Sequence, residues 1–448
     1  MSQPPLPLMC SPLSDAPFVR RNAAAVSSAR FMGEAQAVAR SLPQGKYAIN
    51  LCEDRYHFLL VFVAMLLRGQ VNLLPANRSP GEVQSVSSRY GECPCIVDQA
   101  HPGLGPEQHV VEAASLTPEP PLPEVPSLEP ERICAVVFTS GSTGESQPWE
   151  KRWGELYHGA LLTRRMLTLN DPAMTVVATV PPQHMYGLET TVLLPLVTGM
   201  PVYSGKTFFP HDLQDALQSV PSPRLLITTP VHLNACIESG MDWPAVSQII
   251  SATAPLSTEL AKRAEENFGC PLYEIYGSTE TGAIATRRTR MQQLWRLHEG
   301  LQMRPAGEEP ECVTVQGGHL RQAVELNDRV RIMESGRFTL LGRNSDMLKI
   351  AGKRVSLGDL NHKLLAIPGV EDGVFVDAQE EGQAVTRLCA LVAAPGLTSK
   401  QILDALKDQL DPLCLPRPIY RVERLPRNEA GKLPRKAVLE LLAQLRKK

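Results

Sequence analysis

The sequence lacks a long apolar run. The longest, residues 58–67, is about half of the ~20 residues that a membrane-spanning helix needs, so it predicts a buried helix and no stable membrane insertion. Residues 1–5 also lack the basic patch and apolar segment of a secretory signal peptide. We therefore expect a cytoplasmic protein.

Cysteine and histidine patterns typical of disulfide scaffolds or zinc sites are also missing. The ten cysteines are scattered, and the close pair Cys93 and Cys95 has no second pair to complete a zinc site. The ten histidines include no His-x-x-x-His, which argues against a zincin-type centre. We expect reduced thiols.

The chain has no strong charge imbalance. Its net charge is −2, so no overall field favours nucleic acid or a membrane surface as a partner. Hydrophobic residues make up 43% and charged residues 21%, as in globular proteins. A length of 448 residues is too great for one ordinary core, so we expect two or more domains.

Short apolar segments alternate with helical patterns, which predicts an α/β fold with mostly parallel sheets. The expected strands are residues 47–51, 71–74, 133–138, 175–180, 224–229, 248–252 and 271–276. Ligands of such sheets bind beyond the carboxyl ends of the strands. The loops after Phe138, Val180, Ile250 and Tyr276 are therefore candidate walls of a site.

The residue pattern of about the last hundred residues differs from that of the preceding part of the chain. A polar stretch at residues 342–345 is followed by 346–448, about the length of one small domain. Its end is basic, which indicates either a solvated helix end or a docking face for an acidic partner or a phosphate-rich thiol. Ten basic residues (Arg417, Arg421, Arg424, Arg427, Lys432, Arg435, Lys436, Arg446, Lys447 and Lys448) stand against three acidic ones (Glu423, Glu429 and Glu440).

A loop of small hydroxylated residues and glycines follows the apolar run 133–138. It reads Thr139, Ser140, Gly141, Ser142, Thr143, Gly144. Glycines permit close backbone approach, and successive N–H groups with hydroxyls form an anion-binding nest. The loop is not a Walker A motif, because no Gly-Lys-Ser/Thr follows. By itself it indicates either a phosphate cradle or a Ser/Gly-rich surface loop.

Other segments bear the same kind of chemistry. His184 lies between proline and glycine after a strand, where it is either structural or at a pocket mouth. The small residues Ala252, Thr253 and Ala254 allow a flat ring to lie against backbone. Residues 276–282 combine an aromatic ring, hydroxyls and a carboxylate, and Mg²⁺ prefers oxygen ligands.

Two later residues complete the set. The carboxylate of Asp328 can accept both hydrogen bonds of a ribose diol. Lys432 lies on a glycine-flanked turn and is mobile enough to reach an active site.

These segments, in this order, resemble the acyl-adenylate-forming superfamily of acyl- and aryl-CoA synthetases, peptide-synthetase adenylation domains and luciferases. Residues 139–144 are similar to its phosphate loop, and 276–280 to its Tyr-Gly-x-Thr-Glu motif. The run from Gly342-Arg343 through Lys349, Gly352, Arg354 and Asp359 is similar to its hinge motif, and 428–432 to its final Gly-Lys motif. The resemblance implies a large N-terminal domain, 1–341, with mixed and parallel sheets, a hinge at 342–345, and a small mobile α+β domain, 346–448.

The resemblance also implies an activity, in which a carboxylic acid attacks the α-phosphate of ATP and a thiol then displaces AMP. Thr139, Ser140, Gly141, Ser142, Thr143 and Gly144 would cradle the outer phosphates, Thr279 would contact the α-phosphate, and Glu280 would bind Mg²⁺. Tyr276, Gly277 and Ser278 would face adenine beside Ala252, Thr253 and Ala254; Asp328 and Arg343 would hold the ribose; Lys432 would serve adenylation. His184 would lie where acyl group and thiol meet, and the loop from Lys349 to Gly352 would enter the site for the thiol step.

Several residues depart from the family pattern. In the family a lysine of the phosphate loop usually follows a proline directly after the glycine. Here residues 145–150 intervene before Lys151, which either still contacts the phosphates or does not fill that role. Ser345 stands where the hinge Asp or Lys is usual, and only Asp328 of the Thr-Gly-Asp ribose motif is present. These departures keep open a second function, a nucleotide-binding or regulatory protein with little turnover.

The thiol acceptor is coenzyme A or the phosphopantetheine arm of a carrier protein, and the basic end slightly favours an acidic acyl carrier protein. The acid would bind between residues 184–187, 229–235 and Gly277, where His232 either meets a polar tail or packs. Substrate acids that differ by one methylene are distinguished by only about 1–3 kcal/mol of binding free energy. The sequence therefore does not show which acid is the substrate.

Overall fold

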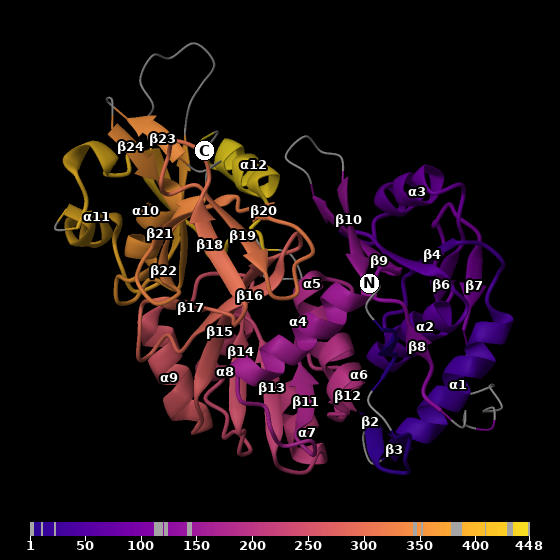
Figure 1. Cartoon of the computed structure of the whole chain (residues 1–448). Coiled ribbons are helices and arrows are strands. Elements are labelled where there is room, and N and C mark those ends of the chain that lie inside the picture. Colours follow the sequence, from indigo (N-terminus) through magenta and orange to yellow (C-terminus); the bar gives the residue numbers. More distant parts are fainter. Residues whose placement is uncertain are drawn as a thin grey trace.

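A computed structural model of the chain describes residues 4–9, 12–21, 24–111, 120, 124–140, 146–343, 347–350, 353–377, 388–407, 409–427 and 433–446. The fold is α/β with mixed sheets, as expected. Figure 1 shows a six-stranded sheet on the right, an eleven-stranded sheet in the lower centre and left, and the C-terminal elements at the upper left.

The six-stranded sheet has the order β10-β9-β5-β4-β6-β7 and is parallel except for β10. Its strands are β4 (Tyr47–Asn50), β5 (Val71–Leu74), β6 (Cys95–Val97), β7 (Gln108–Val110), β9 (Ile133–Ser140) and β10 (Ser146–Arg152). Helices α1 (Ser28–Ser41), α2 (Arg55–Leu67) and α3 (Pro80–Arg89) accompany it. Strands of a parallel sheet are buried on both faces, which is why they appear in the sequence as continuous apolar runs.

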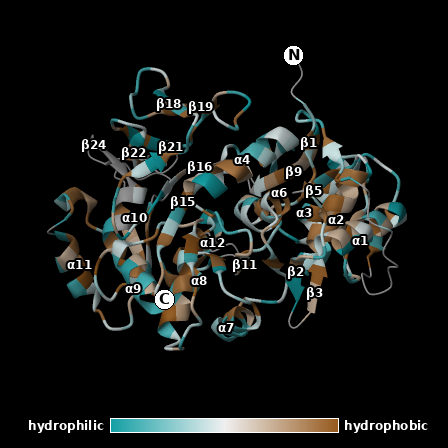
Figure 2. Ribbon diagram, turned by 60° about the horizontal axis from the view of Figure 1, so that its bottom comes forward, coloured by the Kyte–Doolittle hydropathy of each residue, from teal (hydrophilic) through white to brown (hydrophobic). Residues whose placement is uncertain are grey.

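Helix α2 is the buried helix that the longest apolar run predicts. Every side chain from Phe58 to Leu66 is inaccessible to solvent, and Figure 2 shows the helix as predominantly hydrophobic. The carboxylate of Asp54 caps its first turn by accepting from the backbone N–H groups of Tyr56 and His57. No helix in the described ranges is both long and apolar enough to cross a membrane.

The eleven-stranded sheet has the order β21-β22-β17-β16-β15-β14-β13-β11-β12-β2-β3. Strands β2, β12, β11, β13, β14 and β15 run parallel, and the remainder are antiparallel. The strands are β2 (Pro17–Arg21), β3 (Ala24–Ser27), β11 (Thr175–Ala178), β12 (Val202–Tyr203), β13 (Arg224–Thr228), β14 (Gln248–Ser251), β15 (Leu272–Ser278), β16 (Gly282–Arg287), β17 (Trp295–Leu297), β21 (Asp328–Ile332) and β22 (Arg337–Arg343).

Six α-helices and one π-helical turn lie between the strands of this central region. They are α4 (Trp153–Met166), α5 (Met185–Leu188), the π-helix η2 (Glu189–Leu193), α6 (Leu194–Thr198), α7 (Pro210–Ser219), α8 (Pro230–Glu238) and α9 (Thr258–Phe268). Two small sheets complete it, β1 (Leu6–Pro7) with β8 (Ser127–Leu128), and β18 (Leu301–Pro305), β19 (Val313–Gly317) and β20 (Val324–Glu325).

The C-terminal elements have cores of their own. They are β23 (Met347–Ile350), β24 (Lys353–Ser356), α10 (Leu357–Leu365), β25 (Asp372–Asp377), β26 (Leu388–Ala393), α11 (Ser399–Lys407), the 3-10 turn η4 (Pro412–Cys414), β27 (Ile419–Arg421) and α12 (Arg435–Arg446). Their buried apolar side chains, between Leu360 and Leu442, form two clusters separate from those of the preceding residues. The boundary at 342–345 stays a prediction, and Asn344, Ser345 and Asp346 lie outside the described residues.

The predicted strands are all found, with ends shifted by up to two residues. The strand expected at 175–180 ends at Ala178, and the one expected at 133–138 continues to Ser140. The nine cysteines in the described part of the chain are all free. Among those same residues no group of three or more His, Cys, Asp or Glu side chains is arranged to hold a metal ion.

Candidate active site

The candidate site forms at the carboxyl ends of β13, β14 and β15, which run parallel and in adjacent positions. The turn from β15 into β16, residues 276–282, is its centre. A Cβ atom on Gly277 would lie 2.1 Å from the carbonyl oxygen of Gly282, so only glycine fits this close approach. Gly282 itself has φ +64°. The two glycines let the hairpin close tightly beneath Thr279 and Glu280.

Tyr276 and Asp328, which the sequence predicts to face the adenosine, lie side by side. The phenol of Tyr276 donates to Oδ2 of Asp328 at 2.7 Å. The Tyr276 ring packs against Trp295 and Phe338, with ring centroids 5.5 and 5.8 Å away. Asp328 is also directly opposite Arg343 in the pairing of β21 with β22, although the side chain of Arg343 lies outside the described residues. Three predicted nucleotide positions therefore converge.

The tip of the turn is shaped by its own hydroxyl groups. The N–H of Ser278 donates to Oγ1 of Thr281, and the N–H of Thr281 donates to Oγ of Ser278. Thr279 and Glu280, between them, are partly exposed. The Glu280 carboxylate is thus partly exposed at the tip, and carboxylate oxygens are the kind of ligand that Mg²⁺ takes together with substrate phosphates.

Thr253, in the segment after β14, has a strained backbone conformation. Thr253 has φ +79°, a conformation that is rare for a β-branched side chain. Its Oγ1 is buried and has no hydrogen-bond partner in the structure. Ala252 is buried beside it and Ala254 is partly exposed. Strain of this kind collects at ligand sites, and this is where the sequence predicts the adenine ring.

The loop that carries His184 is fixed by a tyrosine. The phenol of Tyr186 donates to the carbonyl of Ile250 at 2.9 Å and lies 3.2 Å from that of Thr228, so it bridges the ends of β13 and β14. His184 precedes α5, and its carbonyl accepts from the N–H of Leu188. This loop and the β14 end therefore form one rigid corner.

His232 is bonded within its own helix. Its Nδ1 lies 2.9 Å from Oγ1 of Thr229, the residue that caps α8. Burial lowers the pKa of His232. These contacts support packing rather than a meeting with a polar substrate tail.

The phosphate loop is described only at its start. Oγ1 of Thr139 accepts from Nε1 of Trp149 at 3.2 Å, across the antiparallel pair β9 and β10. Gly141, Ser142, Thr143 and Gly144 lie outside the described residues, as does the side chain of Ser140. Their predicted part in phosphate binding stays a prediction.

The side chain of Lys151 contacts the main chain of the 276–282 turn. Its side chain is only 5% exposed, and Nζ donates to the carbonyl oxygen of Glu280 at 3.2 Å. Burial lowers the pKa of this ammonium, and the carboxylates of Glu155, Glu189 and Glu280 oppose the shift. In this structure Lys151 holds backbone of the 276–282 turn; its expected contact with phosphate stays a prediction.

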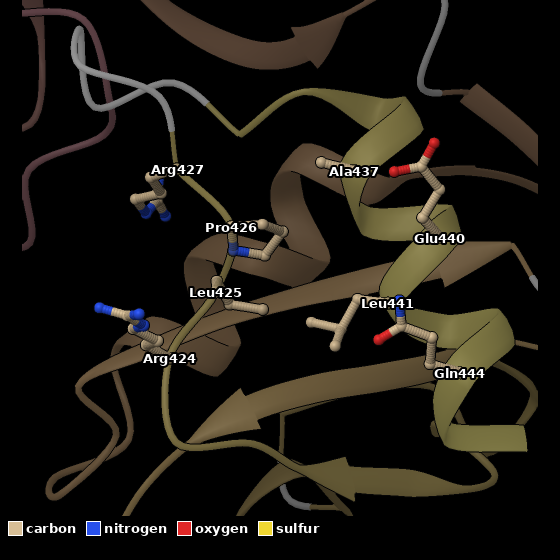
Figure 3. Close-up of a pocket in the computed structure, with 8 residues that line it drawn as sticks. All are labelled: Arg424, Leu425, Pro426, Arg427, Ala437, Glu440, Leu441 and Gln444. Atoms are coloured by element: carbon tan, nitrogen blue, oxygen red, sulfur yellow. The ribbon is translucent and has the colours of Figure 1, made fainter.

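The C-terminal members of the predicted site cannot be placed. Lys432 and Gly352 lie outside the described residues, and so does the side chain of Lys349. The segment before Lys432 is anchored by Arg427, whose Nε and Nη2 each lie 2.7 Å from Asp372. Figure 3 shows this segment across from α12, with Leu425 and Leu441 pointing toward each other.

Glu189 and His319 contribute to the site although the sequence reasoning missed them. Oε1 of Glu189 accepts from the N–H of Ala283 at 3.0 Å, and Nε2 of His319 lies 2.8 Å from the carbonyl of Thr281. Burial raises the pKa of Glu189 to about 7. The one available signal for Glu189 was its position as a lone carboxylate in the mostly apolar stretch 185–200.

His298, near His319, makes the stability of the fold depend on pH. It is 1% exposed, neither ring nitrogen has a partner in the structure, and burial lowers its pKa to about 3. Such a histidine takes up its proton on unfolding, so the free energy of unfolding falls as the pH drops below about 6.5. His298→Leu is expected to reduce this slope by about 1.4 kcal/mol per pH unit. Urea unfolding of both proteins between about pH 5 and 8 measures it; equal slopes would contradict a neutral buried His298.

Comparisons with known proteins agree with this architecture. A family model described as AMP-binding enzyme matches residues 46–315. A 4-coumarate–CoA ligase from Rhodobacter capsulatus is 30% identical over 249 residues, which span 54% of this chain and 60% of that protein. The matched part is thus less than two thirds of that relative's length.

Two solved structures share the fold over nearly the whole chain. ATP-bound MatB from Rhodopseudomonas palustris is 19% identical with a TM-score of 0.80, and the alignment covers 96% of each chain. O-succinylbenzoate coenzyme A synthetase from Bacillus subtilis, in complex with AMP, is 17% identical with a TM-score of 0.79, covering 93% of this chain and 94% of that one.

Proposed function

The chain belongs to the AMP-binding enzyme family, whose model matches more than half of it, and we propose that it is an AMP-forming ligase. In the proposed reaction a carboxylate oxygen of the substrate acid attacks the α-phosphorus of ATP and pyrophosphate leaves. A thiol then attacks the carbonyl carbon of the acyl-adenylate, the thiol proton is lost, and AMP leaves.

The observation that carries this proposal is the hydrogen bond between Tyr276 and Asp328. It joins the Tyr-Gly-x-Thr-Glu segment to a residue 52 positions later whose carboxylate is expected to hold the ribose. The pairing of Asp328 with Arg343 extends the same surface to the strand that precedes the proposed hinge. An aromatic ring and a carboxylate held together suit the adenine and ribose of one nucleotide.

In the adenylation step, different residues would bind different parts of ATP. Thr279 would hold an oxygen of the α-phosphate and Tyr276 the adenine, while Asp328 orients the ribose. A Mg²⁺ ion, when bound with ATP at Glu280, would neutralise charge on the phosphate oxygens. Because the reaction concentrates negative charge, its acceleration would come mainly from positioning and from electrostatic stabilisation.

The acceptor in the second step is proposed to be coenzyme A or a phosphopantetheine arm. The name of the Rhodobacter relative, a CoA ligase, favours coenzyme A. The basic residues near the C-terminus, among them the exposed Arg424 seen in Figure 3, suit either an acidic carrier protein or the phosphates of coenzyme A. His184 would lie where the thiol meets the acyl carbonyl.

The proposal is tested by exchange of labelled pyrophosphate into ATP. We expect exchange to depend on a carboxylic acid and on Mg²⁺ when aromatic, short, medium and long acids are compared. If none of these acids supports the exchange of pyrophosphate, the result would instead favour a nucleotide-binding protein without turnover. With the active acid, mass spectrometry of coenzyme A and of a phosphopantetheinylated carrier then identifies the acceptor; product on coenzyme A alone would exclude the carrier.

A further inference from the structure

Three side chains from different parts of the chain meet the main chain of the 276–282 turn: Lys151 and His319 are buried, and Glu189 is half-buried. Lys151 comes from β10, Glu189 opens the π-helix η2, and His319 follows β19. Each forms a hydrogen bond with a main-chain atom, at Glu280, Ala283 and Thr281 respectively. The contacted residues, Glu280, Thr281 and Ala283, lie next to Thr279 along the chain.

Glu189 is closely fitted to the turn. A Cβ atom on Gly282 would lie 2.5 Å from its Oε1, so the carboxylate occupies the space that the glycine leaves open. It lies at the start of a π-helical turn, a rare irregularity that is frequently found at functional sites.

Charged groups that are largely withdrawn from water are a poor way to stabilise a fold. Desolvating an ammonium and a carboxylate costs several kcal/mol each, and apolar replacements of similar volume are often neutral or stabilising. The same residues are, however, an effective way to hold backbone at one position, because each hydrogen bond has a preferred length and direction. Their arrangement therefore indicates control of geometry rather than of stability.

We propose that Lys151, Glu189 and His319 are positioning residues that hold the 276–282 turn so that Thr279 and Glu280 face the triphosphate. The inference rests on the proposed function, since it assigns a task to the back of the same site. Lys151 acts here through the carbonyl of Glu280, without touching substrate. A displacement of about 1 Å at a reacting centre can cost as much as 10²-fold in rate, so small movements of the turn matter.

The test compares substitutions at Glu189 and Lys151 by pyrophosphate exchange. Glu189→Gln keeps an oxygen that can accept from Ala283, and it is expected to retain at least about half of the wild-type kcat. Glu189→Met and Lys151→Met fill the same space without these bonds, and we expect each to lower kcat about tenfold or more while the KM for ATP changes less than about twofold.

A second measurement is independent of catalysis. Amide hydrogen exchange of residues 279–283 is followed in the same variants without nucleotide. Both Met variants are expected to speed exchange at Ala283 about tenfold or more, although Lys151→Met leaves the Glu189–Ala283 bond intact. Glu34→Met is the control: Glu34 is a buried carboxylate, bonded to Arg30 and Tyr56 in the N-terminal region, and its loss should leave exchange at Ala283 unchanged.

Several results would overturn the inference. Wild-type kcat in folded Met variants would do so, as would a Glu189→Gln variant as impaired as Glu189→Met. A Lys151→Met variant with a tenfold higher KM for ATP and unchanged kcat would assign Lys151 to the phosphates instead. If the wild-type protein shows no exchange of pyrophosphate, the proposed function fails, while hydrogen exchange at Ala283 still decides whether these residues hold the turn.

Discussion

Replacing Lys432 by alanine is expected to lower the rate of adenylate formation by about 10²- to 10³-fold, the usual result of removing one group that stabilises developing charge. Lys432 lies in the Gly-Lys motif near the end of the chain, outside the described residues. The same variant should transfer the acyl group from a supplied adenylate to the thiol at the wild-type rate, because the lysine would serve only the first step. Pyrophosphate exchange and thioester formation from synthetic adenylate measure the two steps separately.

Lys436→Ala is the matched control for this experiment. Lys436 lies four residues further along, on α12, where its side chain is 90% exposed and its ammonium is 4.0 Å from Glu440. An exposed ion pair of this kind contributes little, so neither step should change. Full exchange activity in Lys432→Ala would refute the assigned role of that lysine.

The largest effect on stability is expected for the substitution Arg55→Met. Its guanidinium is buried and donates to the carbonyls of Ala178 and Val180 and to Oγ1 of Thr191, at 3.1, 2.7 and 2.6 Å. Burial lowers the pKa of Arg55 to about 10. Without the guanidinium a buried acceptor such as Val180 is left unpaired, and we expect the free energy of unfolding to fall by about 3 kcal/mol.

Arg55 also joins two parts of the fold. It begins α2, while its acceptors lie at the end of β11 and in η2, next to the loop that carries His184. The substitution is therefore expected to impair the acyl site along with stability, as seen in urea unfolding and in the KM for the acid. Arg68→Met, at the other end of α2, removes one bond to the carbonyl of Ala39 and should cost about 1 kcal/mol. Equal losses in the two variants would contradict a special role for Arg55.

Much of the site's framework could be predicted from local pattern. Continuous apolar runs predicted β9, β11, β13, β14 and β15, because a strand buried on both faces needs apolar residues at successive positions. Parallel neighbours bring their carboxyl ends to one edge, so the polar residues after β14 and β15 were expected to lie together. The bond between Tyr276 and Asp328 agrees with this expectation.

The direction of Lys151 could not be predicted in the same way. The sequence places it after a phosphate-loop pattern, but its environment depends on the register of β10 against β9, where it pairs with Ala135 next to a bulge at Arg152. Successive residues of a strand point to opposite faces, so a shift of one residue would turn the side chain away from the turn.

The sequence by itself determined the family motifs, the apolar strands and the ends of strands at which chemistry collects, because these depend on residues adjacent along the chain. Only the tertiary structure decided which polar side chains from distant parts of the chain meet the turn. Glu189 reaches Ala283 across 94 residues, and His319 reaches Thr281 across 38. Such contacts depend on the rotation of a π-helical turn and on how loops pack over a sheet. Long-range packing sets both, and no local pattern of residue types encodes either one.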